Sequence, residues 1–496
     1  MEAWRPGAPR PTRLGNVEGY HVENFGCRAS QADGDALAAE LSRGGRSAVS
    51  AADAAVVVLN TCAVTAEAER TARAYLRRVK RENPMAQVVV TGCYAQRAPE
   101  EVARLAGVDA VIGNSHKGLL GQVMARIEEQ AAGSGRATES GSVAPGFVAL
   151  RDVAGMGGVP VLVDDCFAHA NLAAEDLAAS CDTRPNLKVQ DGCGNRCSFC
   201  IIPKTRGGSR SVSLDTVLQR VGRFVEAGGK ELVLSGINLG RWGLDLGPRK
   251  FERTPRLEDL VAAIMERTSL PRLRISSVEP MDWVTELLAL YRQYGGVDAA
   301  ATGPRLARHA HLPLQSGADA VLRAMHRRYR PWHYAEKLTA IREAMSEAAI
   351  GADVMVGFPG ETDALFEESY RFIAQQPFTY LHLFPFSARP GTTAWTLAQE
   401  RPVRGEQVRE RMARLRALME EKQSAFRRCV SKGMLSVVTL KAADADRRRG
   451  ATPALSDNFL HIEIDDVFPA NQMLWAGVSH LKNSRDGAPA WCAILG

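Results

Sequence analysis

A loop that carries three cysteines within eight residues restricts the fold of this 496-residue chain more than any other feature. The run DGCGNRCSFC places Cys193, Cys197 and Cys200 at C-x₃-C-x₂-C spacing, directly after NLKVQ, a predicted strand. In β/α barrels, the loops that follow the strands build the active site. We therefore expect this strand to open such a barrel and its loop to carry a ligand site.

The chemistry of this loop follows from its thiolates, which suit iron–sulfur clusters or zinc. The loop contains no fourth protein ligand, so three thiolates would leave one iron of a [4Fe–4S] cluster open to an external group. Two alternatives remain at this point. The loop could be a zinc knuckle that lacks one ligand, or its cysteines could be buried and structural.

A series of β/α units runs from about residue 186 to about residue 415. Helical patterns, for example at 214–226 and 363–375, separate its predicted strands. Six units favour a partial (β/α)₆ barrel. The predicted strands are NLKVQ, KELVLSG, RLRISSV, RHAHLPL, IGADVMVGF and YLHLFPFS.

Residues 18–130 also alternate strands with helices, including a long helix from Ala66 to about Glu82, which predicts a doubly wound parallel sheet. Cys27, Cys62 and Cys93 each come at the end of a predicted strand. Because ligands bind outside the carboxyl ends of such strands, one sheet edge can bring the three thiols together. The alternative is three buried, inert cysteines.

The remaining segments are less informative. Residues 131–185 are rich in Gly, Ser and Ala and predict a linker with one short strand, VPVLVDD. A charged helix from Gln407 to about Arg428 leads into residues 416–496, where LSVVTLKA, FLHIEID and MLWAGVS predict a small C-terminal β-barrel. We interpret four further cysteines as free thiols: Cys166, Cys181, Cys429 and Cys492.

The bulk composition excludes few functions. The net charge of +6 permits a nucleic-acid partner without requiring one. No run of about 18 apolar residues and no secretory signal is present, so we expect no membrane partner and a cytoplasmic protein. Ten cysteines without an export signal indicate metal binding rather than disulfides.

A set of motifs, in this order, resembles the methylthiotransferase family of radical-SAM enzymes from about residue 18 to at least 420. The motifs are NFGC, VVVLNTCAVT, VVVTGCYAQR, VQDGCGNRCSFCIIPKTRGGSRS, LSGINLG, RISSVEP, HLPLQSGADAVLRAMHRRY, MVGFPGET and FPFSARPGT. The resemblance implies that the C-terminal barrel is TRAM-like and binds RNA, although LHIEIDD there is acidic.

The resemblance implies two [4Fe–4S] clusters and S-adenosylmethionine (SAM) as cofactors. Cys193, Cys197 and Cys200 would hold the cluster that cleaves SAM to a 5′-deoxyadenosyl radical. Cys27, Cys62 and Cys93 would hold the auxiliary cluster that carries the sulfur. No side chain acts as a catalyst, because the cofactors do the difficult chemistry. Residues that would contact SAM are Phe199, Gly236, Asn238, Ser276, Ser277 and Glu279; without the resemblance they are ordinary strand ends.

The family contains three branches that differ in substrate. TCAVT, CYAQR and FPFSARPGT are most similar to the branch that methylthiolates C2 of N6-threonylcarbamoyladenosine next to the anticodon in tRNA. The alternatives are isopentenyladenosine tRNA, an aspartate of ribosomal protein S12, and a non-catalytic iron–sulfur sensor that binds RNA. The expected partners are tRNA and a reductant protein such as flavodoxin or ferredoxin.

Overall fold

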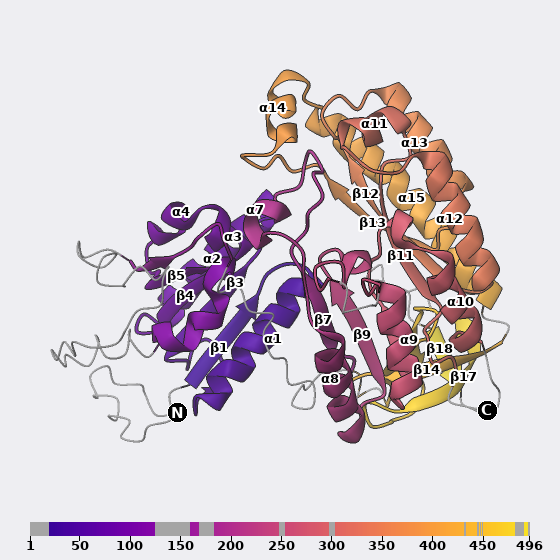
Figure 1. Cartoon of the computed structure of the whole chain (residues 1–496), viewed down its shortest axis with the longest axis horizontal. Coiled ribbons are helices and arrows are strands. Elements are labelled where there is room, and N and C mark those ends of the chain that lie inside the picture. The colour runs from indigo at the N-terminus through magenta and orange to yellow at the C-terminus, as the bar shows by residue number, and fades with distance from the viewer. Residues whose placement is uncertain are drawn as a thin grey trace, which may run out of the picture.

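The chain is described here by a computed structural model, which covers residues 19–124, 159–167, 183–247, 253–296, 303–430, 433–443, 446, 448, 450–481 and 491–494. Three groups of strands follow one another along the chain and lie in three neighbouring parts of the molecule (Figure 1). Within the described ranges, no helix combines the length and the apolar character needed to cross a membrane.

The first part is a six-stranded sheet in the order β2-β1-β3-β4-β5-β6, in which all neighbours are parallel. Its central strand β3 is buried along its whole length, as expected for a parallel sheet covered on both faces. The strands are β1 Gly19–Asn24, β2 Ser47–Ala48, β3 Val56–Thr61, β4 Gln87–Gly92, β5 Ala110–Gly113 and β6 Val161–Leu162. The helices are α1 Arg28–Arg43, α2 Ala66–Glu82, α3 Cys93–Arg97, α4 Pro99–Ala103 and the 3₁₀ helix η1 Asn114–Leu119.

The second part is the expected partial barrel. A four-stranded sheet, β10-β9-β7-β8, and a three-stranded sheet, β11-β12-β13, meet through isolated bridges from Leu273 to Leu306 and from Ser277 to His311. The strands are β7 Asn186–Asp191, β8 Arg210–Ser211, β9 Glu231–Gly236, β10 Arg272–Ile275, β11 His309–Gln315, β12 Ala349–Val356 and β13 Tyr380–Pro385. The six predicted strands are all present, and the short antiparallel β8 is an addition.

Helices cover the outside of this barrel, and its largest apolar core lies between them and the strands. They are α7 Ile202–Arg206, α8 Leu214–Glu226, η3 Leu239–Arg241, α9 Leu257–Arg267, η4 Pro280–Asp282, α10 Thr285–Tyr294, α11 Asp319–Ala324, α12 Pro331–Ala344, α13 Asp363–Gln375, α14 Thr393–Glu400 and α15 Gly405–Val430. The short helix α7 is the exception, because it packs against α3 of the first part (Figure 1).

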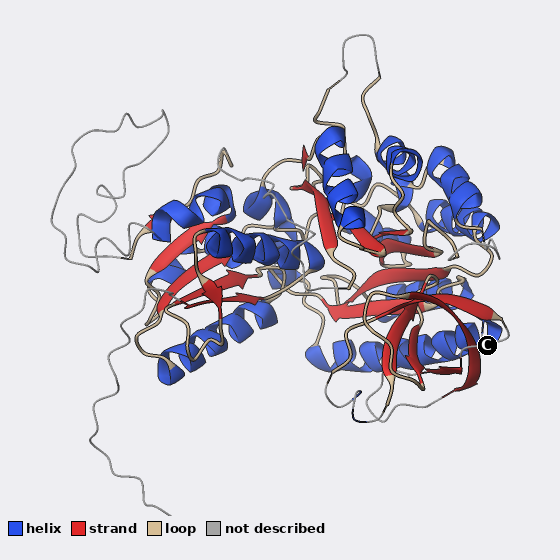
Figure 2. Ribbon diagram, turned by 90° about the horizontal axis from the view of Figure 1, so that it is seen from below, coloured by secondary structure: helices blue, strands red, loops and turns tan. Residues whose placement is uncertain are grey.

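The third part is a closed five-stranded barrel in the order β14-β15-β16-β18-β17. Its strands are β14 Met434–Thr439, β15 Thr452–Ser456, β16 His461–Ile464, β17 Met473–Leu481 and β18 Trp491–Ile494. Figure 2 shows these curled strands beside the central strands. Buried arginines of the central barrel hold the C-terminal barrel in place. Arg274 of β10 donates to the carbonyls of Ser456 and Asp457, and Arg308, just before β11, pairs with the Asp457 carboxylate at 2.6 Å.

Candidate functional site

The first cysteine trio lies in the loop between β7 and α7. The backbone N–H of Cys193 donates to the carbonyl of Gly207, which ties the two ends of the loop together. Two side chains donate to the sulfurs: Asn238 Nδ2 lies 3.4 Å from Cys193 Sγ, and Arg327 Nη1 lies 3.4 Å from Cys197 Sγ. Hydrogen bonds of this kind orient and stabilise metal-binding thiolates.

The second trio follows three adjacent strands of the first sheet. Cys27 precedes α1 after β1, Cys62 follows β3, and Cys93 follows β4 as the first residue of α3. Cys62 and Cys93 are buried, whereas Cys27 is exposed. Asn114 Nδ2 lies 3.3 Å from Cys93 Sγ and 2.8 Å from the carbonyl of Thr205 on α7, so it connects this trio to the segment that follows the other one.

Two glycines that directly precede cysteines of the second trio have no room for a side chain. A Cβ at Gly26 would lie 2.8 Å from the Cβ of Cys62, and one at Gly92 would lie 2.2 Å from the carbonyl oxygen of Thr61. Their φ angles of +120° and +96° also belong to the region that favours glycine. These two positions therefore require glycine, which lets the segments that carry Cys27, Cys62 and Cys93 pack closely together.

The spacing of the thiols argues against a single metal ion. A zinc–thiolate bond is about 2.3 Å long, so two thiolates on one zinc lie within about 4.6 Å of each other. Neither trio is among the described groups whose ligand atoms all lie within 4.8 Å of one another. Burial raises the pKa of the Cys62 and Cys200 thiols to about 12, and bound metal ions would reverse this effect. The zinc-knuckle interpretation is therefore not supported.

A buried ion network fixes the two trios relative to each other. Asp33 of α1 accepts from Lys117 at 2.8 Å, from Arg206 of α7 at 2.9 Å, and from Lys188 of β7. Arg206 also pairs with Asp191, the last residue of β7, at 3.0 Å. Although burial opposes ionisation of Asp33, these three cations hold its pKa well below the usual value. The helix after Cys27 is thus tied to the strand before Cys193.

One cavity of about 580 Å³ joins the two trios. Cys193, Cys197 and Cys200 line it, and so does Cys27 of the second trio. Its volume is in the range of small-molecule and cofactor sites. The cavity extends through the central barrel to Phe459, which the C-terminal barrel contributes between His309 and Tyr380.

All six residues predicted to contact SAM line this cavity: Phe199, Gly236, Asn238, Ser276, Ser277 and Glu279. Asn238 accepts no hydrogen bond at its buried Oδ1 among the described groups, which leaves this oxygen available for an ammonium group. The buried Ser235 Oγ and Gln315 Oε1 in the cavity wall are unpaired in the same way. Buried polar atoms are normally paired, so these atoms indicate a polar ligand.

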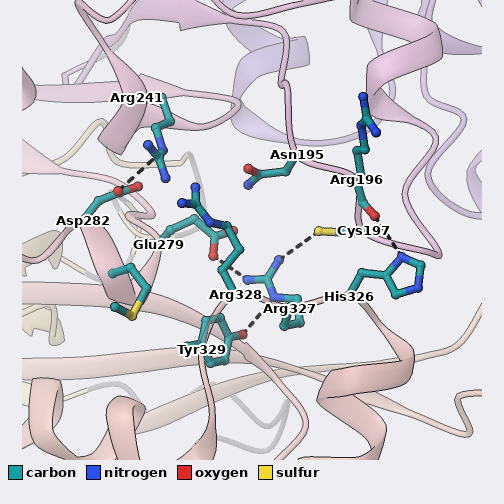
Figure 3. Close-up of a pocket in the computed structure, with 11 residues that line it drawn as sticks. Asn195, Arg196, Cys197, Arg241, Glu279, Asp282, His326, Arg327, Arg328 and Tyr329 are labelled. Atoms are coloured by element: carbon teal, nitrogen blue, oxygen red, sulfur yellow. Dashed lines mark hydrogen bonds and ion pairs between the residues drawn. The ribbon is translucent and has the colours of Figure 1, made fainter.

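Glu279 is already engaged by protein. Its Oε2 accepts from Arg327 Nη2 at 2.5 Å, and Arg327 in turn reaches Cys197 and the hydroxyl of Tyr329, as Figure 3 shows. One carboxylate oxygen of Glu279 thus holds an arginine that donates to a thiol, and the contact of Glu279 with SAM stays a prediction. Asp282 faces Arg241 nearby, at 3.6 Å.

Several cavity residues were not predicted from the sequence: Arg28, His309, His311, Gln315, Asp353, Tyr380, His382 and Phe459. Asp353 accepts from His311 at 3.2 Å and from His382 at 3.3 Å. The signal was available in the strands, since His309 and His311, like Tyr380 and His382, stand two residues apart and point to one face. No pattern in the sequence indicated Phe459.

The predicted charged helix is α15, and several of its basic residues pair with acidic residues of the central barrel. Arg411 is buried and pairs with Glu361 at 2.8 Å, and Arg414 pairs with Glu367 of α13 at 2.9 Å. Cys166 and Cys429 are free thiols, as predicted, and both are exposed. Cys181 lies outside the described residues, as do most of the predicted linker and the side chain of Cys492.

Comparison with known proteins identifies the family. The family model "Uncharacterized protein family UPF0004" matches residues 19–113, and the model of the radical SAM superfamily matches residues 187–373. The protein "Threonylcarbamoyladenosine tRNA methylthiotransferase MtaB" of Aquifex aeolicus is 34% identical over 82% of this chain and 88% of its own. The chain belongs to the methylthiotransferase family of radical-SAM enzymes.

Other relatives of this methylthiotransferase carry two different names. The protein named MtaB in Bacillus subtilis is 30% identical over 88% of this chain and 86% of its own. A protein of Salinispora arenicola named "tRNA-2-methylthio-N(6)-dimethylallyladenosine synthase" is 33% identical over 87% of this chain and 79% of its own. Among solved structures, the radical SAM methyltransferase TsrM of Kitasatospora setae has a TM-score of 0.50 at 16% identity over 77% of each chain, a likeness of fold alone.

As a radical-SAM methylthiotransferase, the enzyme uses SAM and two [4Fe–4S] clusters. The residues present fit these groups. Each trio offers three thiols that are too far apart for one ion, and unpaired polar atoms line the cavity beside the first trio and Cys27.

Proposed function

We propose that this methylthiotransferase transfers a methylthio group to C2 of N6-threonylcarbamoyladenosine next to the anticodon of tRNA. The observation that carries the proposal is the shared cavity, into which all three thiols of the first trio and Cys27 of the second open. Two relatives that span most of this chain are named for the same nucleoside.

The two trios have different roles in this proposal. When bound, the cluster at Cys193, Cys197 and Cys200 supplies the electron that cleaves SAM, and the cluster at Cys27, Cys62 and Cys93 supplies the sulfur. The protein positions both groups and excludes water from the radical. Asn238, Ser276 and Ser277 line the part of the cavity proposed for SAM, next to the first trio.

A second candidate substrate is isopentenyladenosine tRNA, which the Salinispora arenicola relative favours. Its chemistry at the clusters would be the same. The two nucleosides differ in the N6 substituent. In isopentenyladenosine it is an uncharged hydrocarbon, and in threonylcarbamoyladenosine it is an amino acid linked through a urea group. In both cases we expect a tRNA partner, a cytoplasmic location and a reductant protein such as flavodoxin or ferredoxin.

Two measurements test this proposal. The anaerobically reconstituted enzyme is incubated with SAM, a reductant and anticodon stem-loop RNA that carries either nucleoside, and the digested RNA is analysed by mass spectrometry. We expect a mass increase of one methylthio group on threonylcarbamoyladenosine alone. In a strain that lacks the gene, the methylthio form of this nucleoside should disappear from total tRNA. An unchanged nucleoside pool in that strain would contradict the proposal.

A further inference from the structure

The charged side chains that line the cavity are almost all paired with one another. Glu279 pairs with Arg327, and Asp353 accepts from both His311 and His382. These contacts compensate both carboxylates of the cavity wall. A ligand therefore meets no free anion among the described residues that line this cavity.

Arg28 is the exception among the cavity cations. It is the first residue of α1 and follows Cys27 directly, and its side chain lines the cavity. The guanidinium makes no hydrogen bond or ion pair with any residue in the described part of the chain. Its side chain is exposed and lies in the wall of the cavity. A cation that has no protein partner in a cavity wall favours an anionic ligand.

A second, independent feature also indicates a polar ligand. Gln315, at the end of β11, is only 8% exposed, and its Oε1 accepts no hydrogen bond from any described group. Its φ angle of +66° is unusual for a residue other than glycine, and such strain concentrates at functional sites. Arg28 and Gln315 thus offer one cavity a donor for a carboxylate and an acceptor for an N–H group.

We propose that Arg28 forms a carboxylate-binding subsite, which holds the amino acid carboxylate on the N6 substituent of the substrate nucleoside. This inference rests on the function proposed above and deepens it. Threonylcarbamoyladenosine carries one carboxylate and the N–H groups of a urea, which match Arg28 and Gln315. The dimethylallyl group carries neither, so Arg28 distinguishes the two nucleosides. Because Arg28 follows Cys27 directly, the bound substituent would lie next to the second trio, which is proposed to supply the sulfur.

The test compares three variants on two RNAs. The variants are Arg28→Gln, which removes the charge, Arg28→Lys, which keeps it, and the matched control Arg43→Gln at the exposed far end of the same helix. One stem-loop RNA carries threonylcarbamoyladenosine, and the other carries the same nucleoside with its carboxylate converted to a primary amide. Initial rates of methylthio product formation are measured against RNA concentration for each pair.

We expect Arg28→Gln to raise KM for the carboxylate RNA by roughly 10- to 100-fold, the effect of one hydrogen bond to a charged group. KM for the amide RNA should change little, because its carboxylate is already gone. Arg28→Lys should recover part of the loss, and Arg43→Gln should behave as wild type. SAM cleavage without RNA should be unaffected in all variants.

Five outcomes overturn the subsite. Equal losses on both RNAs would mean that Arg28 does not recognise the carboxylate. Loss of SAM cleavage without RNA would assign Arg28 to the carboxylate of SAM. A loss that follows a changed reduction potential of the second cluster would assign it to that cluster. If wild-type enzyme modifies threonylcarbamoyladenosine and Arg28→Gln does so equally well, only the subsite fails. If wild-type enzyme does not modify this nucleoside at all, the proposed function falls and the subsite with it.

Discussion

Cys193, Cys197 and Cys200 lie in one loop after β7, whereas Cys27, Cys62 and Cys93 follow three separate strands of another sheet. The first arrangement needs only one strand and the loop after it. The second exists only when β1, β3 and β4 pair in register, with Asn24 opposite Asn60 and Thr61 opposite Gly92. A distributed site of this kind couples metal binding to the folding of the whole sheet.

The difference also appears in how each trio is supported. Two side chains reach the first trio and complete a local site: Asn238, the residue before η3, and Arg327, in the segment after α11. The backbone approaches closely at both sites, since a Cβ at Gly92 would meet the carbonyl oxygen of Thr61 and one at Gly192, next to Cys193, would meet the carbonyl oxygen of Gly208. The two sites therefore differ in how many segments must meet: one loop for the first trio and three strands for the second.

The largest expected effect separates the two trios by function. Cys193→Ala should reduce SAM cleavage to background, because the open iron that binds SAM needs all three thiolates. Cys62→Ala should leave SAM cleavage measurable and abolish only the methylthio product, while bound iron falls from about eight to about four atoms per chain. Iron analysis and 5′-deoxyadenosine quantification measure these outcomes. A Cys62→Ala protein without any iron would show that the sites are not independent.

An intermediate effect tests the dependence on backbone geometry. Gly92→Ala places a methyl group 2.2 Å from the carbonyl oxygen of Thr61 at a φ of +96°, so the second trio should lose its cluster. The matched control is Gly194→Ala in the first loop, where a Cβ meets no described atom within 4 Å. Iron content should fall by about half in the first variant and stay near wild type in the second. Equal losses would contradict the contrast between the two sites.

Much of the fold could be predicted because its signals are local. The helices α2, α8 and α13 begin where expected, since Thr65, Ser213 and Thr362 cap them by accepting from the third helical N–H group. Cys193, Cys197 and Cys200 stood out by their spacing in one loop, and Cys27, Cys62 and Cys93 because each follows a predicted strand. All six predicted SAM contacts line the cavity for the same reason, as they follow the strands of one barrel.

What could not be predicted depends on contacts between distant segments. Arg28 and Tyr380 line the same cavity, although they are far apart in the sequence. Phe459 reaches His309 from the C-terminal barrel at a ring separation of 4.5 Å and a φ of +64°. Strand β15 was not predicted because its second residue is a proline and its sequence, TPALS, shows no clear alternation of apolar and polar residues. These features follow from the docking of whole elements, which sequence patterns do not encode.

The smallest expected effect concerns two asparagines, each of which donates a hydrogen bond to one cysteine sulfur of its trio. Asn114 donates to Cys93 Sγ at 3.3 Å, and Asn238 donates to Cys193 Sγ at 3.4 Å. Hydrogen bonds to sulfur stabilise the more negative, reduced cluster and raise its potential. Asn114→Ala should therefore lower the potential of the second cluster by roughly 40 mV, which corresponds to about 1 kcal/mol for one electron.

Asn238→Ala provides the matched comparison, and redox titrations followed by electron paramagnetic resonance measure both variants. Each variant should shift the potential of its own cluster and leave the other within error, because the two sulfurs belong to different sites. Asn238 also offers Oδ1 to the cavity, so its variant should in addition weaken SAM binding, whereas Asn114→Ala should not. A shift of both potentials by either variant would show that the two clusters are electronically coupled, and the contrast between a local and a distributed site would then not extend to their redox chemistry.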